Sequence, residues 1–588
     1  MNIVITGEGI VSAIGNSEVE GVESLRLKKS GIGEMRYLRS IHRELPVGEV
    51  KMSNDEMKSA LDIPQTDEVS RTSLMGIMAV CQLIATLPVV DNTQTASPRI
   101  VLVSGTTVGT MDITENHFKN IAEDKDLQYM KYHGCGGSTQ RIADYFGCFS
   151  YATTISTACS SAANAILFGA NLIKAGKADI VVAGGSEPLS RFHLNGFNSL
   201  MILDKERCRP FDETRAGLNL GEGAAYVVLE SEESAKRRGA EIHAYLAGYG
   251  NACDAFHQTA SSDNGEGAYL AMKEALMMAG MQPEDIQYVN AHGTGTPNND
   301  QSESMSLRRI FGEKMPLVSS TKSFTGHTTS ASGSIETVIC LFAMKYGFVP
   351  ANLGWQNQMP DGITPTLGVE TAELHNVICN SFGFGGNDTS LVFSRERPTA
   401  TAETYNPDIK IKVLSKVEIT SDEELADIRK YVKPLAARRM GRLMKSSLLS
   451  SLKALEQAGV EMPDAVITGT AYGCLENTER LLNQLDTDGE ETVSPTYFMQ
   501  STHNTIGSNI AIRLGCHGYN STYSHGSDSL KSAMLDAEML IRSGKCKTVL
   551  VGCHDESTPT LNAMLKKLGE PYSETPVHSI AMVLSCGE

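Results

Sequence analysis

Runs of β-branched residues alternate along this chain with amphipathic segments of helical period. The chain opens on the apolar run IVITGEGIV, residues 3–11, which predicts a core strand. Residues 69–85, VSRTSLMGIMAVCQLIA, place apolar side chains at helical spacing and predict a helix with one buried face. Alternation of this kind is typical of an α/β fold with layered sheets and helices.

The pattern also repeats within the chain. The segment VLVSGTTVGTMDITENHF at residues 101–118 recurs as AVITGTAYGCLENTERLL at 465–482. Residues 154–185 recur without a gap at 522–553. This repeat predicts that the last third of the chain is a second copy of an earlier structural unit.

A linker-like stretch separates the two copies. RERPTATAETYNPD, residues 395–408, is rich in Thr, Ala and Pro, and the strand-like run IKIKVLSKVEI follows it. A chain of 588 residues also exceeds what one hydrophobic core serves. We therefore expect a first domain over residues 1–398, built of halves 1–240 and 241–398, then a linker over 399–406 and a C-terminal domain over 407–588.

Composition limits the classes of function. Hydrophobic residues at 41% and charged residues at 20% describe an ordinary globular protein, and no apolar run approaches the roughly 18 residues that a membrane helix requires. The net charge of −18 argues against nucleic acid as a partner, because a phosphate backbone needs a basic surface. The 13 cysteines show no CxxC pairs, so we expect no metal site and no disulfide framework. With no signal peptide visible, we expect a cytoplasmic protein.

Cys159 is the strongest candidate for chemistry. In the run TTISTACSSAANAILFGANLIK, a β-branched strand ends and a long apolar helix begins at this thiol. The positive end of a helix lowers a thiol pKa toward neutrality, and its free backbone N–H groups can receive an oxyanion. A lone cysteine in such a place is more often a buried structural residue, so its partners decide the interpretation.

Two histidines and a lysine lie further along in turns of small residues. His292 follows the strand-like IQYVNA in the turn AHGTGTPNND, and Lys322 and His327 lie in STKSFTGHTTSASGS. A Gly-rich turn NSFGFGGND, residues 380–388, precedes the strand-like TSLVFS and offers a further backbone donor. Taken singly, each histidine is more often a hydrogen-bonding loop residue. Together with the thiol they form a consistent set for acyl transfer.

These motifs resemble those of the β-ketoacyl-acyl carrier protein synthases. TACSS, NAHGTGT, TKSFTGH and NSFGFGG stand in that family's order and spacing over about the first two thirds of the chain, and the Cys-His-His set is similar to its elongating type II members. The resemblance implies a thiolase-like layered αβαβα fold, with the C-terminal copy as a third, incomplete half. It also implies that no cofactor is needed.

The resemblance implies a role for each member of the set. Cys159 would take an acyl group from a carrier-protein thioester, and His292 and His327 would hydrogen bond the carbonyl of a malonyl thioester while carbon dioxide leaves. The resulting enolate would attack acyl-Cys159 to give a β-ketoacyl product. The backbone N–H groups of Cys159 and Phe384 would form the oxyanion hole, with Phe384 as the gate for the second substrate.

Supporting roles follow from the same resemblance. Lys322 would hold His327 in position and pair with Glu336 on the following helix, and Asp300 and Glu303 would be structural supports. Two residues of the gate loop depart from the Thr-Asn pair that is common in the family: Asn387 and Asp388.

The resemblance further implies a small, acidic acyl carrier protein as partner. Lys205, Arg207 and Arg209, which precede PFDETR, are candidates for a local basic docking cluster. The alternative is an ordinary solvated loop.

The C-terminal copy places Ser527 where Cys159 stands in the first copy, with His525 nearby. It has no counterparts of the two catalytic histidines, so we expect no independent catalysis there. It resembles a degenerate N-terminal half of a synthase and, in lacking the cysteine, a chain-length factor. Because synthases of this type pair through that half, two arrangements stay open: an intrachain pseudodimer, or a homodimer of the first domain.

Two classes of function remain. The first is an active condensing enzyme that uses acyl- and malonyl-carrier proteins in fatty acid or polyketide/polyene biosynthesis. The second is a non-elongating, chain-length-factor-like scaffold for a separate synthase. Intact Cys159, His292 and His327 favour the first class, since a scaffold has no need of an activated thiol.

Overall fold

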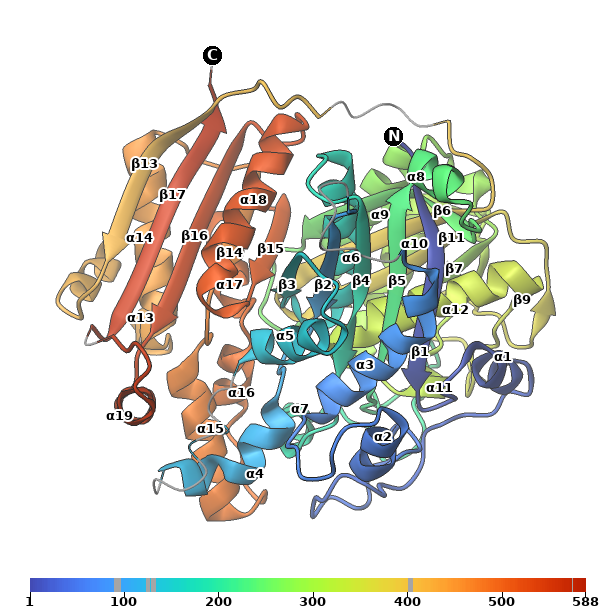
Figure 1. Cartoon of the computed structure of the whole chain (residues 1–588), viewed down its shortest axis with the longest axis horizontal. Helices are drawn as coiled ribbons and strands as arrows, with labels where there is room; N and C mark the ends of the chain where they lie inside the picture. Colours follow the sequence, from blue (N-terminus) through green and yellow to red (C-terminus); the bar gives the residue numbers. More distant parts are fainter. Residues whose placement is uncertain are drawn as a thin grey trace.

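One hydrogen-bonded sheet runs through the whole protein (Figure 1). The computed structural model describes residues 1–88, 97–122, 127, 129, 134–399, 405–573 and 575–587, so most of the expected linker lies outside the described residues. Read across the sheet, the described strands are β13 (Ile411–Ile419), β17 (Val577–Cys586), β16 (Thr548–Glu556), β14 (Ala465–Gly469), β15 (Tyr519–Tyr523), β3 (Tyr151–Ile155), β2 (Ile100–Gly105), β4 (Ile180–Glu187), β5 (Gly223–Ser231), β1 (Ile3–Ser12), β6 (Ala244–Cys253), β12 (Asn387–Ser394), β11 (Asn376–Gly383), β7 (Tyr288–Asn290) and β8 (Leu317–Ser319). A separate small ribbon pairs β9 (Phe348–Val349) with β10 (Glu370–Thr371).

The sheet consists of three groups of five strands that share one topology. With the strands of a group numbered in chain order, each group reads 1-5-4-2-3: β13-β17-β16-β14-β15, β1-β5-β4-β2-β3 and β6-β12-β11-β7-β8. The repeat between the first and last groups was visible in the sequence, and the middle of the chain adds a further copy that begins at β6. The layered α/β fold with a third half is thereby confirmed, and this half carries the same five strands as the other two rather than an incomplete set.

Helices cover this sheet and separate its layers. In chain order the helices of the described residues are α1 (Glu18–Arg26), α2 (Asn54–Ala60), α3 (Arg71–Leu83), α4 (Met111–Ala122), α5 (Cys135–Phe146), α6 (Ser161–Lys174), α7 (Arg191–Ser199), α8 (Glu232–Arg238), α9 (Glu266–Ala279), α10 (Pro297–Phe311), α11 (Lys322–Thr325), α12 (Ser332–Tyr346), α13 (Pro434–Arg438), α14 (Arg442–Ala458), α15 (Leu475–Asp488), α16 (Pro495–Ser501), α17 (Thr505–Leu514), α18 (Ser529–Arg542) and α19 (Pro559–Leu568). The helix expected at residues 69–85 is α3, and the Ser70 hydroxyl caps it by accepting from the Ser73 N–H.

Helices α6 and α12 form the centre of the first domain. Every side chain of α6 from Ser161 to Ile173 is buried, and the helix contacts strands of both the first and the second half. A helix that is apolar or small on all sides is stable only between two layers, because no face of it can remain in water. The N-termini of these two helices meet at the site described below.

The C-terminal domain adds its strands to the same sheet at β3. β15 runs antiparallel to β3, with Tyr523 opposite Ile155. The Ser156 N–H donates to the Thr522 carbonyl and the Ser524 N–H donates to the Thr154 carbonyl, each at 2.9 Å. These contacts are symmetric with respect to the internal repeat, so the two copies face each other across a pseudo-twofold axis.

Candidate active site

Cys159 lies in a tight turn between β3 and α6. The turn, Ala158–Ser160, is a single 3₁₀ turn that leads directly into the helix, and Cys159 is 5% exposed. Ala158 has a φ of +52°, a left-handed conformation that costs energy for a residue with a Cβ. In the C-terminal copy the same position is Gly526, with φ of +54°. The strained turn presents the thiol at the N-terminal end of α6.

The two expected histidines converge on this thiol. His327 Nε2 lies 3.0 Å from Cys159 Sγ, and the ring centroids of His292 and His327 are 5.3 Å apart at 82°. One nitrogen of each ring and the sulfur lie within 4.8 Å of one another. The structure therefore brings together the three residues that the sequence selected, although they are separated by up to 168 positions.

Lys322 contacts His292, and the expectation that it holds His327 is wrong. Its ammonium lies 3.2 Å from His292 Nδ1 and 2.5 Å from Glu336 Oε1. An ammonium only donates, so Nδ1 of His292 accepts and its proton resides on Nε2. His327 Nδ1 instead lies 3.0 Å from the hydroxyl of Ser332, a group that donates or accepts. The Lys322 contact thus fixes His292 in a single tautomer. The Ser332 contact leaves both tautomers open to His327.

Asp300 and Glu303 organise the turn that carries His292. The Glu303 carboxylate accepts from the backbone N–H groups of His292 and Gly293 at 2.8 and 2.7 Å. The Asp300 carboxylate accepts from the Phe211 N–H at 2.7 Å and from the Gly295 N–H at 3.2 Å. Both carboxylates point into the backbone of the turn rather than toward the thiol. A supporting role for Asp300 and Glu303 stays a prediction, to which these hydrogen bonds give a physical basis.

Burial dominates the electrostatics of the site. It raises the pKa of the Cys159 thiol to about 12, while the Lys322 ammonium and the Phe384 backbone N–H act in the opposite direction. The expected pKa near neutrality is therefore not found. Burial, together with the Lys322 ammonium, also lowers the pKa values of both His292 and His327 well below the ordinary value. The resting site holds a thiol beside two neutral imidazoles.

The Gly-rich loop closes over the thiol. The Phe384 N–H points to Cys159, and the Phe384 ring stacks on Phe197 with centroids 5.8 Å apart. A cavity of about 380 Å³ opens beside it, lined by the thiol, both histidines, Phe382 and Phe384. The Cys159 thiol thus faces this cavity, and the loop around Phe384 forms part of its wall.

The C-terminal domain contributes residues that sequence reasoning missed. Phe498 of α16 lies against Phe197 with ring centroids 5.2 Å apart, and a methyl group on Gly196 would lie 2.1 Å from its ring. Phe498, Val108 and Met111 line a cavity of only about 30 Å³ between the two domains. Phe498 stands in a stretch without a motif. Its position within the repeated C-terminal segment is the only signal that the sequence gives for Phe498.

Ser527, the C-terminal counterpart of Cys159, has different surroundings. Ser527 is exposed, whereas Cys159 is buried. The His525 ring contacts the Thr154 hydroxyl of the first domain at 3.0 Å. Among the described residues, no histidine forms a hydrogen bond with Ser527.

The expected docking residues differ in their surroundings. Lys205 and Arg207 are exposed. The Arg209 guanidinium instead forms ion pairs with the carboxylates of Asp204 and Glu206, with N···O distances of 3.3 and 2.5 Å. A groove of about 1060 Å³ adjoins the catalytic opening through Gln258, whose neighbour Thr259 lines that opening. Of the described residues that line this groove none is acidic, and five are basic: Lys433, Arg438, Arg439, Arg480 and Arg513. Such a groove is unusual on a chain of net charge −18.

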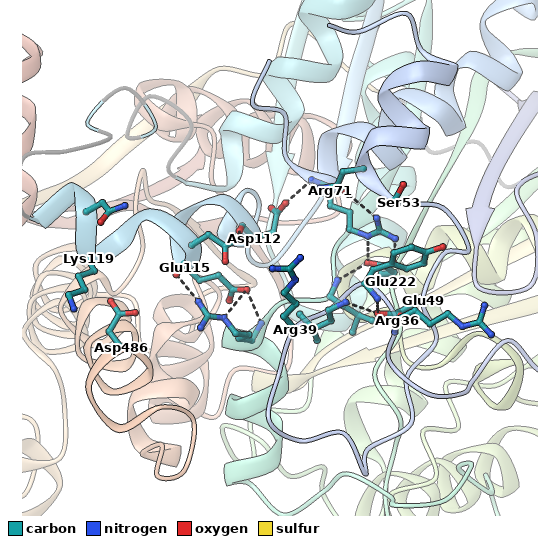
Figure 2. A pocket seen from close by; sticks show the side chains of 17 residues that line it. Arg36, Arg39, Glu49, Ser53, Arg71, Asp112, Glu115, Lys119, Glu222 and Asp486 are labelled. Carbon is teal, nitrogen blue, oxygen red and sulfur yellow. Dashed lines mark hydrogen bonds and ion pairs between the residues drawn. The ribbon is translucent and has the colours of Figure 1, made fainter. Parts of the chain in front are cut away.

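A second large cavity lies away from the thiol (Figure 2). It measures about 810 Å³ and shares no lining residue with the cavity at Cys159. Its charges are largely matched, since the Arg71 guanidinium donates to the Glu222 carboxylate at 2.6 Å and Arg191 faces Glu115 at 3.7 Å. Matched pairs offer no concentrated charge to a ligand, and the Ser53 hydroxyl in the wall of this cavity hydrogen bonds with Glu56 at the start of α2.

Cys159, His292 and His327 also have the spacing of a metal-ligand set. A divalent ion among them would lie close to the Lys322 ammonium, which contacts His292 directly. Repulsion between these cations disfavours a metal there. Separately, of the helices in the described ranges none combines the length and apolar character that crossing a bilayer demands.

Comparison with known proteins shows which family of proteins this chain resembles. Models of the N-terminal domain of beta-ketoacyl synthases match residues 1–235 and again 415–588, and a model of their C-terminal domain matches residues 243–356. The 3-oxoacyl-[acyl-carrier-protein] synthase 2 of Vibrio cholerae is 33% identical over 412 residues, which cover 67% of this chain and 99% of that protein. Nodulation protein E of Rhizobium meliloti is 32% identical, with the same two shares covered.

Two solved structures show how far the likeness extends. The ishigamide ketosynthase/chain length factor has 30% sequence identity and a TM-score of 0.62, over 67% of this chain and 99% of that one. The PfaC keto synthase-chain length factor matches 100% of this chain and 78% of its own, with a TM-score of 0.81. Its 16% identity makes that likeness one of fold alone.

Proposed function

We propose that this chain, which belongs to the beta-ketoacyl synthase family, catalyses a decarboxylative Claisen condensation between an acyl group on Cys159 and a malonyl thioester on a carrier protein. The observation that carries the proposal is the contact between His327 Nε2 and Cys159 Sγ at 3.0 Å, next to His292 with its proton on Nε2. The product is a β-ketoacyl thioester, in fatty acid or polyketide/polyene biosynthesis.

In the first step Cys159 takes the acyl group. His327 Nε2 accepts the thiol proton as sulfur attacks the thioester carbonyl, and Ser332 accepts from the Nδ1–H of His327. The backbone N–H groups of Cys159 and Phe384 stabilise the oxyanion. The carrier-protein thiolate leaves and recovers the proton from His327, so the step ends with an acyl-cysteine and neutral histidines.

In the second step the malonyl group loses carbon dioxide. The Nε2–H groups of His292 and His327 donate to the thioester carbonyl, and the electron pair of the breaking C–C bond forms an enolate that these donors stabilise. The enolate carbon attacks the acyl-Cys159 carbonyl. A new C–C bond forms, the C–S bond breaks, and the Cys159 thiolate takes up one proton from solvent water. Ser332 supports the change of tautomer that His327 needs between the two steps.

The partner we propose is an acyl carrier protein that docks on the basic groove of the C-terminal domain. Lys433, Arg438 and Arg439 are exposed cations of this groove, and Lys205 and Arg207 are exposed cations of the first domain. A small acidic protein is complementary to such a groove. Arg209 is left out of this surface because it is paired internally.

The C-terminal domain, in this proposal, replaces the second subunit of a dimer. It occupies the edge of β3 and closes the space beyond Val108 with Phe498, which limits the length of the acyl chain. A chain-length-factor-like scaffold without condensing activity is the alternative, favoured by the likeness to ketosynthase/chain length factor structures. The complete set of thiol, imidazoles and Lys322 favours the enzyme.

Intact-protein mass spectrometry after incubation with acyl-carrier proteins of graded chain length tests this function. We expect the wild type and Ser527→Ala to gain one acyl group and Cys159→Ala to gain none. Addition of a malonyl-carrier protein should then release the acyl group as a β-ketoacyl product. Failure of Cys159 to retain an acyl group from any donor would favour the scaffold.

A further inference from the structure

We infer that the C-terminal domain positions the gate loop of the active site through Asn504. The inference rests on the proposed condensing activity, because it concerns the same site. Asn504 directly precedes α17 and is 1% exposed. Its amide nitrogen donates to the Phe384 carbonyl at 2.7 Å and to Asn387 Oδ1 at 2.8 Å. One side chain of the C-terminal domain thus holds both ends of the short turn Phe384–Gly386.

The orientation of the Asn504 side chain is unfavourable for its own helix. An asparagine at an N-cap ordinarily accepts a hydrogen bond from the first turn, but the Asn504 side chain accepts none from α17. Its Oδ1 is buried without a hydrogen-bond partner. Because the Phe384 carbonyl can only accept, the NH₂ group must face the loop. Contact with the gate loop is therefore what holds this side chain in place.

The loop backbone is fitted closely to α17. Gly385 has a φ of +84°, and a methyl group added to it would lie 2.2 Å from Ser508 Oγ and 3.0 Å from Asn504 Nδ2. Ser508 also donates to Asn387 Oδ1 at 3.2 Å. A glycine is required here by both its conformation and the close approach of the helix.

The contact also explains a departure from the family pattern. Asn387 stands where a threonine is common, and its Oδ1 is the acceptor for both Asn504 and Ser508. Its Nδ2 donates to the Asn520 side chain at 3.0 Å. A threonine hydroxyl could not make all of these contacts, so the gate loop is adapted to the C-terminal domain of this chain.

The contact reaches the reacting atoms through one residue. The Phe384 N–H points to Cys159, while the carbonyl of the same residue is held by Asn504. Asn504 therefore keeps the oxyanion donor aligned when the loop is closed, and the loop must break both hydrogen bonds to open. Asn504 is a positioning residue for acyl transfer, and the C-terminal domain influences when the second substrate enters.

Two variants of the full-length protein test this role, with an asparagine on another helix of the C-terminal domain as matched control. Asn504→Asp keeps the size of the side chain and can cap α17, but it cannot donate to Phe384. Asn504→Ala removes the contact altogether. Asn483→Ala removes an exposed asparagine of α15, in the same domain, whose amide nitrogen donates to the Glu479 carbonyl of its own helix at 2.9 Å and which lines neither the catalytic cavity nor the basic groove.

The two half-reactions are measured separately in single turnovers. We expect Asn504→Asp and Asn504→Ala to slow acyl transfer to Cys159 about tenfold or more, the size of one lost buried hydrogen bond. Decarboxylation of the malonyl thioester, which uses the histidines, should change less than about threefold, since neither histidine contacts Asn504. Asn483→Ala should behave like the wild type in both assays.

Thermal unfolding of each variant separates positioning from folding. We expect Asn504→Asp to keep the wild-type melting temperature while it loses acyl transfer. Equal rates of acyl transfer in Asn504→Asp and wild type would overturn the inference, as would an equal loss in both half-reactions. A wild type that neither loads an acyl group nor releases carbon dioxide would instead refute the proposed function itself.

Discussion

Ile155 and Tyr523 pair across the junction of the two domains, at equivalent positions of the internal repeat. Ile155 leads into the turn of Cys159, and Tyr523 leads into the turn of Ser527. The Tyr523 ring also packs on Phe168 of α6 with centroids 5.2 Å apart. The strand edge beside the nucleophile is therefore occupied by the chain itself, and the partner copy at that edge is degenerate.

Deletion of the C-terminal domain should expose this edge. An open β3 edge offers unpaired backbone groups and an apolar surface, so a chain ending at residue 398 should self-associate or aggregate. The full-length protein should be a single chain by light scattering after size exclusion. A full-length dimer that survives deletion of residues 405–588 would refute the intrachain pseudodimer.

Lys322→Met should impair decarboxylation more than acyl transfer. Without the ammonium, Nδ1 of His292 is free to carry the proton, and Nε2 no longer donates reliably to the thioester carbonyl. We expect a loss of about 10²-fold or more in carbon dioxide release. Glu336→Gln keeps the Lys322 ammonium and weakens only the ion pair that holds it. The rate of carbon dioxide release should therefore fall less than in Lys322→Met. Equal effects on the two half-reactions would contradict this assignment of the tautomer.

Phe498→Ala should lengthen the acyl chains that Cys159 accepts. Removing the ring opens the cavity of about 30 Å³ behind Val108 and Gly196. The same change should destabilise the protein by about 3 kcal/mol, as is typical for loss of a buried aromatic ring. Phe498→Leu keeps more of the packing and serves as the milder variant. Acyl-loading profiles measured by mass spectrometry should shift to longer chains in the order wild type, Leu, Ala.

Charge reversal in the basic groove should weaken use of the carrier protein. Arg438→Glu combined with Arg439→Glu should raise KM for an acyl-carrier protein about tenfold or more and reduce its dependence on salt. The kcat, and the rate with a small acyl thioester that lacks the protein, should stay close to wild type. Lys205→Glu with Arg207→Glu is the matching pair on the first domain. If KM is unchanged in Arg438→Glu/Arg439→Glu but raised in Lys205→Glu/Arg207→Glu, the carrier protein docks on the first domain instead.

Asp388→Asn should stabilise the protein at neutral pH. Burial and the neighbouring carboxyl groups of Asp254 and Glu303 raise the pKa of Asp388 well above its ordinary value. The folded state therefore favours the protonated form, and its stability falls as pH rises from the ordinary carboxyl pKa of about 4 toward the raised value. The side chain introduced by Asp388→Asn does not ionise, so the stability of this variant does not fall in this way as pH rises. Denaturant melts at pH 4 and pH 7 should show a gain only at pH 7, and an equal gain at both would contradict the assignment.

Several features of this protein follow from the sequence alone. Cys159, His292 and His327 could be selected because each lies in a short motif whose local geometry serves its chemistry. The internal repeat predicted a third half of the fold, since equal patterns of strands and helices fold alike. Asp300 and Glu303 were predicted to be supports from the family resemblance, and the structure places both in the helix that follows the His292 turn.

Other features depend on contacts between segments far apart in the chain. Lys322 is five residues from His327 yet reaches His292, because the short helix α11 directs its side chain to the other strand end. The helix N-terminus suggested a thiol pKa near neutrality, but the pKa depends on the burial that all the surrounding layers produce. Phe498 and Asn504 meet the active site only where two copies of the repeat pair across β3 and β15. No local sequence pattern could reveal these two residues. Which residues lie opposite each other across the pseudo-twofold axis is determined only when the two domains fold together.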